Sequence, residues 1–75
     1  MAYGYASHAE GYHTLAEGSY SHAEGLGTIA SSEAQHVSGE YNEINDKALF
    51  IIGNGTENNR SNILVATHEG ISIPP

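Results

Sequence analysis

Small and larger residues alternate along the first part of the chain. The letters SHAEG occupy residues 7–11, and TLAEG follows at residues 14–18 with the same arrangement of small positions. A period of two is typical of a β-strand, because successive side chains of a strand point to opposite faces. The pattern therefore predicts five-residue strands that are separated by two-residue corners.

The same letters return every fourteen residues. His8 is followed by His22 and His36, and the neighbouring alanine and glycine columns repeat at the same step. A coiled coil is a poor explanation of the seven-residue half-period, because each glycine costs about 1 kcal/mol in a helix relative to alanine. We predict instead a β-solenoid over residues 1–46, with fourteen-residue coils that each advance by about 4.8 Å.

The predicted coil directs its small residues inward. Serine, threonine, alanine and glycine would line a narrow lumen, while histidine and glutamate would lie outside. Glycine is expected at the corners, because it adopts backbone angles that other residues resist. Leu15 and Ile29 would form an aliphatic row on the outside. Exposed apolar patches usually mark contact surfaces, so this row predicts self-association.

The pattern changes after Asp46, where we place the end of the solenoid. Residues 47–53 (KALFIIG) predict a strand, residues 54–61 a turn that starts with Asn-Gly, and residues 62–70 a second strand. A short third strand would cover residues 71–73. We predict that residues 47–75 form a β-hairpin-like cap that intertwines with neighbouring chains. The candidates for contact between chains are Leu15, Ile29, Leu49, Ile51, Ile63 and Val65.

Length and composition make partner chains the expected source of stability. A chain of 75 residues buries little surface, large aliphatic residues are scarce in its first half, and it has no cysteine for disulfides. The net charge is −7, with Lys47 and Arg60 as the only lysine and arginine. This charge argues against binding nucleic acid or anionic membranes. No apolar run approaches the ~20 residues of a spanning helix, and no signal peptide is recognisable.

The histidine column is the main candidate for chemistry. If His8, His22 and His36 lay near a three-fold axis, imidazoles from three chains could hold a metal ion. Residues 1–46 contain seven acidic groups and no lysine or arginine, so pairing with glutamate is the simpler explanation. We therefore predict no metal and no cofactor. Neighbouring serine and histidine point to opposite faces of a strand, so we also predict that the chain is not an enzyme.

The tandem SHAEG units and the later segments GNGT (53–56) and RSN (60–62) resemble a known group of proteins. They are similar to head repeats of YadA-type trimeric autotransporter adhesins. They resemble still more closely the repeats in tail-fibre proteins of phages and prophages of Gram-positive gut bacteria. The resemblance covers residues 4–46 and 53–62, with departures at Ser32, Val37 and residues 42–46.

The resemblance implies a left-handed β-roll with three identical chains side by side. It also implies a location in a virion tail fibre or at the cell surface, and a function in attachment to a glycan or protein on a host cell. One alternative is a bacterial adhesin head. Another is a mechanical spacer or trimerisation module that is attached to an enzyme or to a receptor-binding domain.

Overall fold

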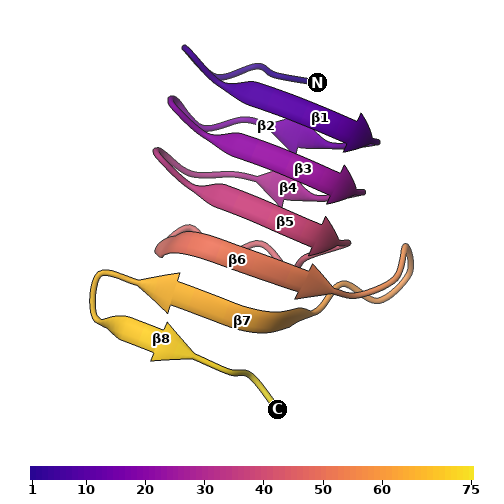
Figure 1. Cartoon of the computed structure of the whole chain (residues 1–75), viewed down its shortest axis with the longest axis vertical. Coiled ribbons are helices and arrows are strands. Elements are labelled where there is room, and N and C mark those ends of the chain that lie inside the picture. Colours follow the sequence, from indigo (N-terminus) through magenta and orange to yellow (C-terminus); the bar gives the residue numbers. More distant parts are fainter.

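The computed structural model describes residues 1–75 and contains strands but no helix, which confirms the prediction of an all-β chain. A six-stranded sheet has the order β1-β3-β5-β6-β7-β8, and a two-stranded sheet pairs β2 with β4 (Figure 1). The strands are β1 (His8–Tyr12), β2 (Leu15–Ala16), β3 (His22–Leu26), β4 (Ile29–Ala30), β5 (His36–Glu40), β6 (Ala48–Asn54), β7 (Asn62–Thr67) and β8 (Gly70–Ser72).

Consecutive coils stack in parallel and in register, as a solenoid requires. On the long sheet His8 lies opposite His22, and His22 lies opposite His36. On the short sheet Leu15 lies opposite Ile29. Figure 1 shows β1, β3 and β5 as successive strands of the six-stranded sheet, which we call the long wall. β2 and β4 lie behind them in the two-stranded sheet, which we call the short wall. The resulting molecule is thin, with extents of 32 × 28 × 13 Å.

Small side chains fill the space between the two walls, as the alternation predicts. Ser21 and Ala23 of the second coil are buried, whereas His22 between them stays partly exposed. The buried hydrophobic residues from β1 to β6 are Ala16, Ala23, Ala30, Val37, Ala48 and Ile51. Side chains of this size keep the two walls close together, so the fold has the narrow interior that the sequence predicts.

Glycine is required in the coils mainly because neighbouring coils approach too closely to leave room for a Cβ atom. Gly25 has a φ of +106°, and a Cβ atom on it would lie 2.1 Å from the carbonyl oxygen of Gly39 in the next coil. The expectation that glycine forms every corner is wrong. Left-handed backbone at the corners falls mostly on other residues, namely Ala6, His13, Tyr20, Ala34 and Tyr41.

The long wall continues beyond the predicted end of the solenoid at Asp46. β6 pairs with β5 in parallel, with Val37 opposite Ile51 and Gly39 opposite Gly53. The apolar run of residues 47–53 conceals this continuation in the sequence, because isoleucine and phenylalanine replace the alanine and histidine of earlier coils. The change from coil to cap therefore follows β6 on this wall.

β6 is also the first strand of the predicted hairpin. β7 runs antiparallel to β6, and β8 runs antiparallel to β7. Ile51 lies opposite Val65 on this hairpin, and both side chains are buried in the core of the single chain. These two residues are therefore corrected from candidates for contact between chains to core residues.

The short wall ends on two asparagine side chains instead of a further strand. The Ile29 amide N–H donates to Asn42 Oδ1 at 2.7 Å, and Asn42 Nδ2 donates back to the Ile29 carbonyl at 3.1 Å. Asn62 makes the same pair of bonds with the backbone of Glu43, at 2.8 and 2.9 Å. Each amide thus takes the place of a paired strand and satisfies backbone groups at the end of the wall.

We expect Asn42→Ala to lower the free energy of unfolding by about 2 kcal/mol, because the Ile29 N–H would lose its partner inside the protein. Urea unfolding monitored by circular dichroism measures the change. Asn58→Ala is the control, since Asn58 is exposed and its side chain makes no hydrogen bond. Equal losses in the two variants would contradict the role assigned to the Asn42 amide.

We expect Gly25→Ala to cost roughly 2–4 kcal/mol, because both the positive φ and the contact with Gly39 oppose a methyl group. Gly70→Ala separates the two effects. Gly70 also has a positive φ, of +143°, but no atom lies within 4 Å of the point where a methyl group would be added. Thermal or urea unfolding should show a larger loss for Gly25→Ala, and equal losses would argue against close stacking as the main cause.

Candidate functional site

The outward face of the long sheet carries one continuous row of side chains across all six strands. Paired positions of neighbouring strands point to the same face, so the strand register defines the row. Its members, in order, are His8, His22, His36, Phe50, Ala66 and Ile71. The row is polar and aromatic on the coils and becomes apolar on the hairpin.

The three histidines of the row form a stacked ladder. The ring centroids of His8 and His22 are 4.7 Å apart, and those of His22 and His36 are 4.6 Å apart with the rings 1° from parallel. Phe50 extends the stack, 4.8 Å from His36. In-register strands separate equivalent side chains by about 4.8 Å, so the repeat itself brings these rings into stacking contact.

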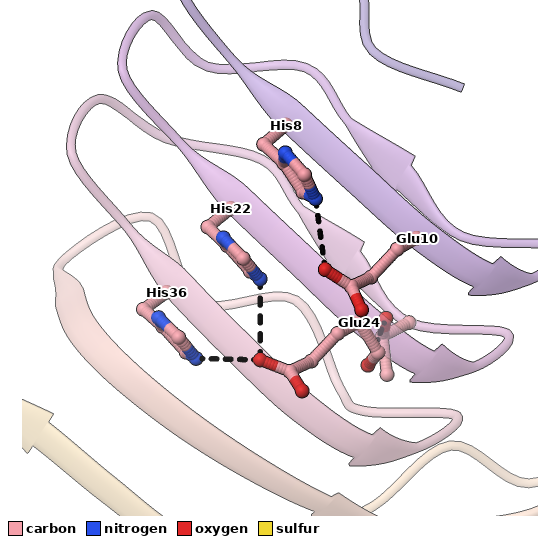
Figure 2. A network of polar contacts seen from close by, with 6 residues as sticks. His8, Glu10, His22, Glu24 and His36 are labelled. Atoms are coloured by element: carbon pink, nitrogen blue, oxygen red, sulfur yellow. Dashed lines mark hydrogen bonds and ion pairs between the residues drawn. The ribbon is translucent and has the colours of Figure 1, made fainter.

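Glutamates two residues further along β1 and β3 reach back to the histidine ladder (Figure 2). Glu10 Oε1 lies 2.8 Å from His8 Nε2. Glu24 Oε1 lies 3.1 Å from His22 Nε2 and 3.3 Å from His36 Nε2, so a single oxygen contacts two rings. The predicted pairing of histidine with glutamate is present, and it joins neighbouring coils as well as residues of one strand.

These side chains form two overlapping groups of metal-ligand type. His8, Glu10 and His22 make the first group, and His22, Glu24 and His36 make the second. Within each group the donor atoms lie within 4.8 Å of one another, and His22 belongs to both. His22 Nε2 is buried, and its contact with Glu24 meets the distance but not the angle of a hydrogen bond. The arrangement can pair protonated imidazole with carboxylate, or bind a cation.

An apolar patch adjoins the histidine ladder on the same face. It consists of Phe50, Ile52, Leu64, Ala66 and Ile71. Phe50 is 37% exposed and Ile71 is 74% exposed. This patch was not among the predicted surfaces, although extending the fourteen-residue step from His36 would have placed Phe50 in the outward row.

The remaining candidates for contact between chains lie elsewhere on the surface. Leu15 and Ile29 are neighbours on the short wall and are partly buried. Leu49 is also partly buried, and Ile63 is about half exposed, at 48%. The structure thus offers two apolar surfaces, one on each wall, and the patch on the long wall is the one continuous with the histidine ladder.

Arg60 has a structural role that its position in the sequence did not indicate. Its Nη1 donates to the carbonyl oxygens of Gly27 and Asn42, at 2.9 and 3.2 Å. The guanidinium also lies 5.6 Å from the centre of the Tyr41 ring. These contacts attach the loop between β6 and β7 to the corners of the solenoid. They give a structural role to Arg60, which is the only arginine of the chain.

Comparison with family models, with curated proteins and with solved structures finds no match to this chain. The structure contains no helix that is long and apolar enough to cross a membrane. The features that bear on function are therefore the repeat, the two walls and the side chains that they present.

Proposed function

We propose that the chain is a structural and adhesive module of a homotrimeric fibre, as in a phage tail fibre or a similar adhesin. It would act at the virion surface or cell surface, in attachment to a glycan or protein of a host cell. The proposed module is a left-handed β-roll of fourteen-residue coils whose apolar surfaces are covered by sister chains, and it has no catalytic role.

The apolar patch is the observation that carries the association of sister chains in this proposal. The buried hydrophobic core has seven residues, and four of them are alanines. A core of this size supplies little of the burial that a small domain needs, and such domains are commonly stabilised by association. Contact between sister chains at Phe50 and Ile71 would add the missing burial.

The charge of the module is consistent with the proposed partners. The chain carries a net charge of −7, and Arg60 is already engaged with backbone oxygens. A polyanionic partner would be repelled, whereas a neutral glycan or a protein surface without strong negative charge would not. The regular stacking of coils equally supports a mechanical spacer, because in-register rungs give a constant rise along a fibre.

We expect light scattering to give a solution mass of three chains, and Phe50→Glu to reduce it, because a carboxylate would be placed in the apolar patch. Tyr12→Glu is the control, since Tyr12 is 65% exposed and lies outside the patch. A folded monomer of the unchanged protein would contradict the proposal. Dissociation by Leu15→Glu but not by Phe50→Glu would move the contact to the short wall.

Binding to a glycan array and to whole bacterial cells separates adhesion from a spacer role. An adhesive module should retain a sugar or a cell surface when it is presented as the isolated trimer. A stable trimer that binds neither would support the spacer and reject the adhesive part of the proposal.

A further inference from the structure

We propose that His22, Glu24 and His36 bind one divalent transition-metal ion of the class that includes Zn²⁺ and Ni²⁺. The site is built from two neighbouring strands of one chain, β3 and β5. It therefore differs from a site on a three-fold axis and does not depend on the proposed trimer. It revises the sequence-based expectation that the histidine column binds no metal.

The donor set and its spacing fit such an ion. Imidazole nitrogen and carboxylate oxygen bind Zn²⁺ at about 2.0–2.2 Å, so two donors of one ion lie roughly 3–4 Å apart. Glu24 Oε1 is 3.1 Å from His22 Nε2 and 3.3 Å from His36 Nε2, which already meets this requirement. The Nε2 atoms of His22 and His36 lie within 4.8 Å of each other. To bind the same ion, the two rings need to tilt until these atoms are closer by roughly 1 Å.

The tilt requires the two imidazoles to move within a stack that His8 and Phe50 continue on either side. The side chains of His22, Glu24 and His36 are 32%, 41% and 38% exposed, so an ion can approach the group from solvent, and the buried His22 Nε2 atom becomes accessible to it once the rings tilt. Phe50 covers the outer face of the His36 ring. His22 Nε2 makes no aligned hydrogen bond, so an ion at this nitrogen displaces no strong interaction. A neutral imidazole can hold its proton on Nδ1 and offer Nε2 to the ion.

The second group of donors is a better site than the first. In the first group Glu10 Oε1 contacts His8, and those two side chains are 61% and 60% exposed, so water competes strongly for their donor atoms. In the second group a single Glu24 oxygen already touches both rings. The acidic chain favours cation binding at either position, and an ion would also offset the repulsion between Glu10 and Glu24, which lie opposite each other.

Sharing of His22 limits the protein to one ion per chain. Both groups need the same Nε2 atom, so occupancy of the second group empties the first. Loss of His36 should move the ion to His8, Glu10 and His22 with weaker affinity, and loss of His8 should leave the preferred site intact.

Titration of the full chain with Zn²⁺ in a calorimeter at pH 7.5 tests the proposal. We expect one Zn²⁺ per chain, little change in His8→Gln, and weaker binding in His36→Gln. We expect His22→Gln to weaken Zn²⁺ binding at least tenfold. Replacing a residue that binds the ion directly should lower the affinity at least as much as replacing a residue that only hydrogen-bonds to a ligand. His13→Gln and His68→Gln are controls outside the histidine ladder, and Ca²⁺ tests whether acidity alone attracts cations.

The double variant His8→Gln/His36→Gln provides a second test of the site in case His22→Gln does not fold. It keeps His22 but disrupts both groups, so it should also lose binding while retaining the circular dichroism spectrum of the unchanged chain. Absence of Zn²⁺ binding, undiminished binding in both the double variant and His22→Gln, equal binding of Ca²⁺, or loss of binding in His13→Gln would each overturn the proposal.

Discussion

The close stacking of each coil on the next is the constraint on which the rest of the structure depends. The backbone of Gly25 approaches Gly39 so closely that a methyl group would lie 2.1 Å from a carbonyl oxygen. Coils at this separation align in register, and alignment turns every position of the repeat into a column. Inside, the columns are small where the two sheets face each other, as at Ala16, Ala23 and Ala30. Outside, the same alignment places identical side chains against each other, whether or not they attract.

The end of the solenoid follows from the same constraint. The inner column that starts with Ala9 and Ala23 continues with Val37 and Ile51, so side-chain volume increases where the short wall stops. The antiparallel hairpin then adds Val65 to that core. The backbone groups left at the end of the short wall are satisfied by asparagine amides, which need no further strand. At this end of the solenoid, the hairpin therefore completes the hydrophobic packing, whereas the asparagine side chains complete the backbone hydrogen bonding.

The sequence predicted those features that depend on the repeat, and it missed those that depend on contacts between distant segments. Alternation around Ala23 and the column of His22 indicated the strands, the inner face and the outer face. The continuation at β6 was missed because Phe50 occupies the position of histidine in its column, so the fourteen-residue repeat is no longer visible from identical residues. The roles of Asn42, Asn62 and Arg60 could not be read from spacing, since asparagine and arginine in a turn-rich segment have no fixed partner until the loop is placed.

The histidine ladder shows how a structural repeat can create chemistry without a dedicated cleft. Parallel strands in register place imidazoles 4.6–4.7 Å apart, and a glutamate two residues later on the same strand faces the same side. The arrangement is slightly too wide for one ion to bridge two rings, but Glu24 already links them through one oxygen. Each added coil would add one histidine and one further group, but neighbouring groups share a histidine, so the number of ions held at the same time would grow only about half as fast. The spacing that makes the solenoid stable thus also limits how many ions it could hold.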